Sequence, residues 1–142
     1  MRLVLCRNKS LASLILRAYM GSRWSHAAIW DDTTGEVTDS TFAQGGVRRH
    51  HEVDFFAKHT EFREIDIPVD DLGAARMWLG QQEGKSYDWS ALFGIFFRTG
   101  MWEDDDRWFC SELAETFIGR FGKRRFQEIA ACITPYHQDI LA

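Results

Sequence analysis

The hydrophobic pattern of this chain changes period near Asp70, and this change constrains the fold more than any other feature of the sequence. Before Asp70, short apolar or alternating segments are bounded by turn residues, as in residues 2–6 and 62–69. After it, apolar residues recur every three or four positions, as in residues 72–79 and 110–121. Strands followed by helices predict an α+β fold, in which an antiparallel sheet packs against helices.

The remaining segments add a hairpin and one helix before Asp70 and two helices after it. Residues 24–30 and 36–42 predict a hairpin, because the turn-rich segment 31–35 separates them. Ser10 can cap a helix that Gly21 ends. The apolar residues of this helix share one face: Leu11, Leu14, Ile15 and Ala18. Two further helices are predicted, over residues 88–97 and 126–132.

Length and composition predict one globular domain. A chain of 142 residues can bury a core but is too short for two ordinary domains, so residues 1–142 are expected to form a single domain with one site. A hydrophobic content of 45% argues against disorder. The net charge of -4 gives no general attraction to nucleic acid, and we interpret the basic clusters at residues 48–51 and 123–125 as solvated surface. No nucleic-acid partner is expected.

The cysteines and histidines do not form a recognisable metal or disulfide pattern. Cys6, Cys110 and Cys132 are widely spaced and include no CxxC pair. The other candidates for a metal site match no common ligand spacing and are interpreted as surface residues: His50, His51, Asp54 and His59. We therefore expect neither a metal nor another cofactor, and we interpret Cys6 and Cys132 as inert core thiols.

The sequence lacks the features of an exported or membrane-spanning chain. Arg7 interrupts the apolar residues that follow Met1, and the later apolar run over residues 11–20 contains Arg17. No uncharged apolar stretch approaches the ~20 residues that cross a bilayer. We expect no signal peptide, no transmembrane segment and a cytoplasmic, reducing location.

Cys110 is the strongest candidate for a nucleophile. It is predicted to begin a helix, and it shares the apolar stripe of that helix with Leu113 and Phe117, so its sulfur faces the protein. Unpaired N–H groups at a helix start favour a negative charge and hence the thiolate. A free thiol has a pKa of about 8.5, so it also needs a neighbouring base. The competing interpretation is that Cys110 is a small buried hydrophobic residue.

His26 is the best candidate for this base. If Trp30 and Gly35 close the hairpin turn, His26 lies directly opposite Asp39, with Cβ atoms ~4.5–5.5 Å apart. The carboxylate can then hold one ring nitrogen of His26 and leave the other to exchange a proton with Cys110. The competing interpretation is a half-buried strand histidine and a solvated aspartate.

Short segments around these residues follow one another in a distinctive order: 24–30 around His26, 37–40 around Asp39, 85–89 around Tyr87, 109–113 around Cys110, and 133–135. This order resembles the NlpC-type cell-wall peptidases of the papain-like cysteine peptidase superfamily, in their circularly permuted, YiiX-like branch. In that branch the histidine precedes the cysteine. This chain has Asp39 where the branch often has glutamate.

The resemblance implies a papain-like, permuted NlpC-type fold and a cysteine peptidase or amidase. Such an enzyme hydrolyses an amide bond of a small peptide or cell-wall-like substrate. Cys110, His26 and Asp39 would be the catalytic triad, with an acyl-enzyme formed on Cys110. The backbone amide of Cys110 and the hydroxyl of Tyr87 would stabilise the oxyanion. Three tryptophans are candidate walls of the substrate cleft: Trp24, Trp89 and Trp108.

Two alternative functions stay open. A thiol acyltransferase or lipid-ester hydrolase would use the same acyl-enzyme, since related permuted folds handle acyl chains. A non-catalytic module would instead bind a peptide or a partner protein with the triad retained but unused. Because a wall-degrading enzyme must meet its substrate outside the cytoplasm, a phage-associated lytic or tail role is a further hypothesis.

Overall fold

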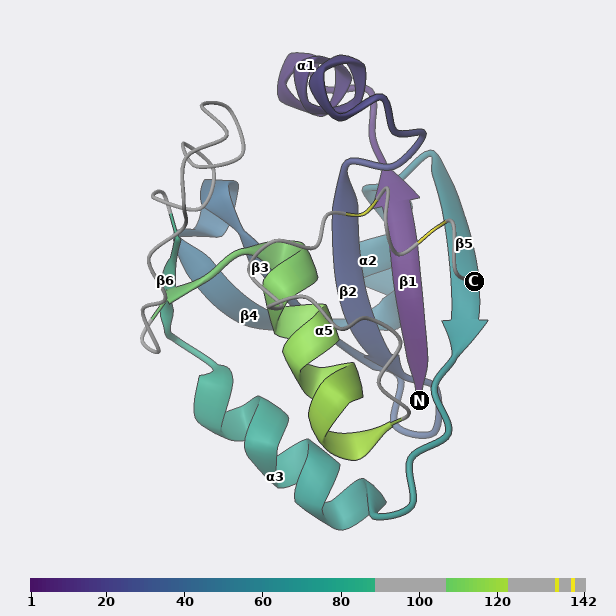
Figure 1. The fold of residues 1–142 in the computed structure, drawn as a ribbon, viewed down its shortest axis with the longest axis vertical. Coiled ribbons are helices and arrows are strands. Elements are labelled where there is room, and N and C mark those ends of the chain that lie inside the picture. Colours follow the sequence, from purple (N-terminus) through teal and green to yellow (C-terminus); the bar gives the residue numbers. More distant parts are fainter. Residues whose placement is uncertain (89–106, 123–134, 136–138, 140–142) are drawn as a thin grey trace.

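The fold is built on one mixed β-sheet (Figure 1). The computed structural model describes residues 1–88, 107–122, 135 and 139. Seven described strands pair in the order β5-β1-β2-β3-β4-β6-β7; β6 and β7 are parallel, and the other neighbouring pairs are antiparallel. In chain order they are β1 (Arg2–Arg7), β2 (His26–Asp31), β3 (Glu36–Thr41), β4 (Gly46–His51), β5 (Glu61–Asp66), β6 (Ser86–Tyr87) and β7 (Arg107–Trp108).

The fold is α+β, as predicted, and helices lie on both sides of the sheet (Figure 1). The prediction of an antiparallel sheet is wrong at one edge, because the two-residue strands β6 and β7 pair in parallel. The described helices are α1 (Leu11–Met20), the short 3-10 helix η1 (Phe42–Gln44), α2 (Glu52–Ala57), α3 (Leu72–Gln82) and α5 (Cys110–Phe121). In Figure 1, α5 crosses in front of β2 and β3, and α2 lies behind them. The predicted helix over residues 126–132, and that over 88–97 beyond Asp88, fall outside the described residues.

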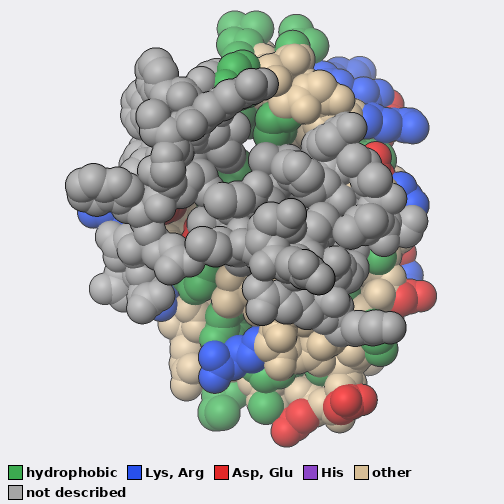
Figure 2. All heavy atoms as spheres, viewed as in Figure 1, with side chains coloured by type: hydrophobic (Ala, Val, Ile, Leu, Met, Phe, Trp, Pro, Cys, Tyr) green, Lys and Arg blue, Asp and Glu red, His purple; other side chains and the backbone are tan. Residues whose placement is uncertain are grey.

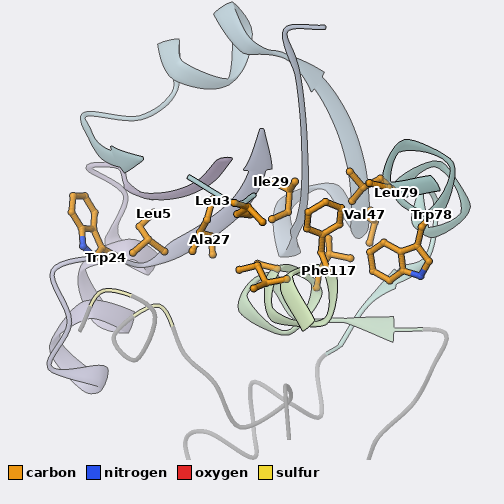
Figure 3. Packing of buried hydrophobic residues seen from close by; sticks show 14 residues of the cluster. Leu3, Leu5, Trp24, Ala27, Ile29, Val47, Trp78, Leu79 and Phe117 are labelled. Atoms are coloured by element: carbon orange, nitrogen blue, oxygen red, sulfur yellow. The ribbon is translucent and has the colours of Figure 1, made fainter. Parts of the chain in front are cut away.

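Alternation along the strands divides the core between the two faces of the sheet. On one face, Leu3 and Leu5 belong to a cluster that includes Phe117 of α5 (Figure 3). On the other face, a smaller cluster packs with α2 and consists of Val4, Cys6, Ala28, Val37 and Phe55. His26 and Asp39 alternate in step with Ala28 and Val37, so they lie on the α2 face.

A close approach between β4 and β6 fixes the position of Tyr87. Gly46 has a φ of 145°, and a side chain at this position would collide with the carbonyl group of Lys85. The amide of Val47 donates to the carbonyl of Lys85 at 2.9 Å, and the amide of Tyr87 donates to that of Gly45 at 3.1 Å. These bonds hold Tyr87 at the edge of β4.

Helix α1 turns its apolar face outward. Its predicted limits are confirmed, since the Ser10 side chain caps the first turn and Gly21 ends the helix with a φ of 62°. A helical apolar stripe normally faces the core. Here the stripe is exposed at Leu11 (71%), Leu14 (54%) and Ile15 (49%). The buried residue of α1 is Ser13, whose hydroxyl lies 2.7 Å from that of Ser25.

Candidate active site

The hairpin of β2 and β3 brings His26 and Asp39 together, although in a different register from the predicted one. Asp39 lies opposite Ala28, not His26, because Asp31 and Glu36 close the turn in place of Trp30 and Gly35. The predicted register is therefore wrong. Since side chains alternate with period two, the two-residue shift keeps His26 and Asp39 on one face and makes them diagonal neighbours.

The physical reason for the shift lies in the turn. The carbonyl of Asp31 accepts hydrogen bonds from the amides of Thr34 and Gly35, at 3.2 and 2.9 Å. Gly35 adopts a φ of 73°, which favours glycine. The loop therefore spans residues 32–35, and Asp31 joins the strand.

The predicted contact is nevertheless formed. His26 Nε2 lies 2.7 Å from Asp39 Oδ2, and the Asp39 side chain is 3% exposed. An ionised carboxylate only accepts hydrogen bonds, so Nε2 of His26 carries the hydrogen. This bond fixes the ring orientation and leaves Nδ1 as the nitrogen available to another partner.

That partner is Cys110. Burial alone lowers the pKa of His26, but hydrogen bonds to Asp39 and Cys110 outweigh it and raise the pKa to about 10. The ring is therefore stable as an imidazolium at neutral pH. A positive ring between a carboxylate and a cysteine sulfur is the charge arrangement that stabilises a thiolate.

Several contacts place Cys110 at the start of α5. The Glu112 carboxylate accepts from the backbone amide of Phe109 at 3.2 Å, and the amide of Leu113 donates to the carbonyl of Phe109 at 3.0 Å. Just before the helix, the Ser40 hydroxyl of β3 donates to the carbonyl of Trp108 at 2.6 Å. The first turn of α5 is thus tied to the sheet, and its N–H groups favour negative charge beside the buried Cys110 sulfur.

The three predicted triad residues line one cavity of about 270 Å³. The sheet supplies His26, Asp39 and His50, and α5 supplies Cys110. Its other walls include Ala12, Ser13, Leu16, Phe42, Phe55, His59, Tyr87 and Phe109. The structure therefore gathers residues that are far apart in the sequence around a space of small-molecule size.

Tyr87, the predicted oxyanion donor, lines this cavity. Burial is the main cause that raises its pKa, and the charges of Cys110 and Asp88 raise it further. The phenol consequently stays neutral and keeps its hydrogen for donation. Its ring meets that of Phe109 edge to face, with centroids 6.0 Å apart.

The tryptophans do not form the described walls of the cavity. Trp24 is 3% exposed in the core cluster near Leu5 (Figure 3). Trp108 packs against Trp78, and its indole nitrogen donates to the Gln82 side chain at 3.2 Å. Both are held by core packing, and smaller aromatic rings line the cavity in their place. Trp89 lies outside the described residues.

His50 is the functional candidate that sequence interpretation missed. Its Nε2 lies 3.0 Å from Asp39 Oδ1, so two histidines on β2 and β4 flank one carboxylate on β3. Both hydrogen bonds lower the pKa of Asp39 to about 2, against the effect of burial, which raises it. Alternation after the Gly45-Gly46 bend could have placed His50 on the same face as Asp39.

His59 also belongs to the site rather than to the surface. Its ring stacks on that of His26, with centroids 6.0 Å apart and an interplanar angle of 7°. Burial lowers its pKa, so the ring stays neutral, and Nδ1 lies 2.8 Å from the carbonyl of Phe55. His51, by contrast, is exposed and caps α2, in agreement with the sequence interpretation.

Cys6 contrasts with Cys110. It is fully buried, as predicted for a core thiol. Burial raises its pKa well above the ordinary value, and the charges of Asp39 and Cys110 act in the same direction. Cys6 is therefore held as the neutral thiol. Cys132 lies outside the described residues.

In residues 1–88 and 107–122, no group of three or more His, Cys, Asp or Glu side chains is arranged to hold a metal ion. Within the described part of the chain, no helix has the length and apolar character to span a membrane. No protein-family model and no curated protein matches this chain. The chemistry of the site therefore rests on the geometry of Cys110, His26 and Asp39.

Proposed function

We propose that this protein is a cysteine-dependent hydrolase that cleaves an amide bond with Cys110, His26 and Asp39 as its triad. One observation carries the proposal: His26 Nε2 lies 2.7 Å from Asp39 Oδ2, and Cys110 lines the same cavity as these two side chains. The order of the segments around these residues, which resembles the permuted NlpC-type branch, supports a papain-like fold and the same roles.

Acylation uses each group at a defined atom. The Cys110 thiolate attacks the substrate carbonyl carbon and forms a carbon–sulfur bond. The carbonyl oxygen becomes negative, and the Cys110 amide at the start of α5 and the Tyr87 hydroxyl are the proposed donors to it. The carbon–nitrogen bond then breaks, and His26 Nδ1 gives its proton to the leaving amine.

Hydrolysis reverses the direction of proton transfer. His26, now neutral, accepts a proton from water while the water oxygen attacks the thioester carbon. The carbon–sulfur bond breaks, the carboxylic acid leaves, and Cys110 returns to the thiolate beside the imidazolium. Asp39 keeps Nε2 protonated throughout, so that Nδ1 is the atom that exchanges the proton.

The cavity favours a small substrate. A volume of about 270 Å³ fits a short peptide segment or a small amide, not a folded protein. The aromatic rings of Phe42, Phe55 and Phe109 line it together with the triad. The proposed substrate class is therefore a small peptide or cell-wall-like amide.

Alkylation with iodoacetamide, followed residue by residue by mass spectrometry across pH, tests the proposed nucleophile. Cys110 should react well below the pH at which Cys6 reacts, because Cys6 is buried and its pKa is raised. The His26→Ala variant should lower the rate at Cys110 by about 10²-fold or more at neutral pH. Equal rates at the two cysteines, unchanged in His26→Ala, would favour the binding module.

A second measurement follows the acyl-enzyme. Peptide amides, acylated amines and acyl esters are each incubated with the protein, and its intact mass is recorded. An acyl adduct on Cys110 that water releases supports the hydrolase, whereas transfer to an added amine or alcohol supports the acyltransferase. The Cys110→Ala variant, which has no thiol at this position, is the blank.

A further inference from the structure

Helix α1 exposes apolar side chains at the surface, and its one buried residue is a serine. Leu11, Leu14 and Ile15 are 71%, 54% and 49% exposed, whereas Ser13 is buried against Ser25. Tyr19 extends the same surface at 43% exposure. Figure 2 shows green side chains at the top of the molecule, where Figure 1 places α1. In the described structure this apolar stripe is exposed to water, which is energetically unfavourable. A binding partner that covers the stripe would remove this exposure.

The surroundings of α1 are positively charged. Residues 7–23, which include α1 and the segments on either side of it, contain four Lys and Arg residues and no Asp or Glu, although the net charge of the chain is -4. Arg7 and Arg23 pair with the same carboxylate, that of Glu61, so two cations share one anion. Figure 2 shows blue side chains, with red ones among them, at the upper right.

A cationic depression adjoins the helix. It has a volume of about 490 Å³ and is lined by Arg7, Asn8, Lys9, Arg17, Thr60 and Glu61. Three of these side chains are basic and one is acidic. A helix that lies in a membrane interface has apolar side chains that enter the acyl region. It also has cations beside them that bind phosphate headgroups.

We propose that α1 docks this protein onto an anionic lipid bilayer, with the helix axis parallel to the membrane surface. Ten residues give a helix ~15 Å long, which can lie in the interface but not cross it. The side chains of Leu11, Leu14 and Ile15 enter the boundary between headgroups and acyl chains. Lys9 and Arg17 bind lipid phosphates at its edge.

A bilayer fits this surface better than a second copy of the chain does. A twofold interface through α1 would bring the Lys9 and Arg17 side chains of two copies near one another, and like charges would repel. A stable dimer buries ~800 Å² on each partner, which four exposed side chains of a short helix do not supply. Anionic lipids instead neutralise the same cations.

Docking through α1 would also orient the candidate active site. Ala12, Ser13 and Leu16 of α1 line the cavity that contains Cys110 and His26. The cavity would therefore lie next to the bilayer surface. The docking proposal does not depend on the proposed hydrolase, because lipid binding by α1 requires no reaction at Cys110.

Cosedimentation with large unilamellar vesicles tests the proposal. The full chain should bind vesicles of phosphatidylcholine and phosphatidylserine more tightly than vesicles of phosphatidylcholine alone. Raising the salt from about 0.1 M to about 1 M should weaken binding, because the Debye length falls from ~10 Å to ~3 Å. The Leu14→Ser, Ile15→Ser double variant should bind at least about tenfold more weakly. The Lys9→Ala variant should bind the anionic vesicles about fivefold more weakly than the unmodified chain does.

A matched control is available on other helices. Val53 of α2 and Met77 of α3 are 65% and 64% exposed, so the Val53→Ser, Met77→Ser double variant removes similar apolar surface away from α1. It should bind vesicles as the unmodified chain does, and Cys110→Ala should too. No binding to anionic vesicles, or equal losses in the two double variants, would overturn the proposal. A dimer in light scattering that only Leu14→Ser, Ile15→Ser dissociates would assign the surface to a second copy instead.

Discussion

The hairpin of β2 and β3 carries two buried aspartates, one in each strand, and their partners differ. Asp31 accepts from Arg76 Nε at 2.6 Å and from the Thr33 hydroxyl at 2.6 Å. Asp39 is bonded by His26 and His50. Both carboxyl groups have lowered pKa values, because these hydrogen bonds outweigh the effect of burial.

The partners of the two aspartates differ in whether they can exchange a proton. A guanidinium keeps its proton under all ordinary conditions, so Arg76 gives Asp31 a permanent countercharge and joins β2 to α3. An imidazole can gain and lose a proton, so His26 can exchange a proton at Nδ1 while Asp39 holds Nε2. The cavities beside the two aspartates support the same distinction. Asp31 borders a cavity of about 10 Å³, whereas Asp39 borders one of about 270 Å³, which has room for a small molecule.

The largest expected effect is a pH-dependent stability that the Asp39 network has and the Asp31 network lacks. The pKa of His26 is raised from 6.5 to about 10. The stabilisation of the folded state by the protonated ring is therefore fully present below pH 6.5 and is lost as the pH rises through about 10. The difference in unfolding free energy between the unmodified chain and His26→Gln should therefore fall by up to a few kcal/mol over this range.

Urea unfolding at a series of pH values measures this difference. Arg76→Gln is the matched variant, because Arg76 keeps its charge over the same range. Its difference from the unmodified chain should stay constant between pH 6.5 and 10. If the His26 difference is equally constant, the imidazolium is not stabilised by Asp39 and Cys110, and the contrast between the two aspartates fails.

The second effect separates reactivity from stability. Asn in place of Asp39 can donate to His26 Nε2, which moves the ring hydrogen to Nδ1 and leaves no base for Cys110. The alkylation rate of Cys110 at neutral pH should fall about 100-fold in Asp39→Asn. Asp31→Asn should leave this rate unchanged and lower the free energy of unfolding by about 1–3 kcal/mol.

Mass spectrometry of alkylated Cys110, combined with urea unfolding of the same two variants, checks both halves of this prediction. A similar loss of rate in Asp31→Asn would mean that general destabilisation, not the orientation of His26, controls the thiol.

Much of the site could be predicted because it depends on local alternation. The period of two in β2 and β3 places His26 and Asp39 on one face, and this holds in the predicted register as well as in the observed one. The position of Cys110 followed from the helical spacing of α5. A prediction from such patterns survives a two-residue error in the turn, because each side chain stays on the same face of the sheet.

The parts that were missed depend on contacts between distant segments. His50 meets Asp39 only through the pairing of β4 with β3, and the run of basic residues around it resembles a solvated surface. Trp24 and Trp108 are large and apolar, which predicts burial but not which space they fill. The spacing in α1 likewise showed that Leu14 and Ile15 share a face, but not that this face is exposed.

The smallest expected effect concerns His50, which contacts the carboxylate and not the thiol. Its bond to Oδ1 restrains Asp39, and the bond between Asp39 Oδ2 and His26 does not involve His50. His50→Leu should therefore lower the alkylation rate of Cys110 by only about three- to tenfold. His50→Gln should retain most of the rate, because the Gln amide can donate to the same oxygen. Parallel unfolding curves separate this positioning role from a loss of packing: if Leu and Gln variants of equal stability lose the same rate, the hydrogen bond to Oδ1 has no part in orienting Asp39.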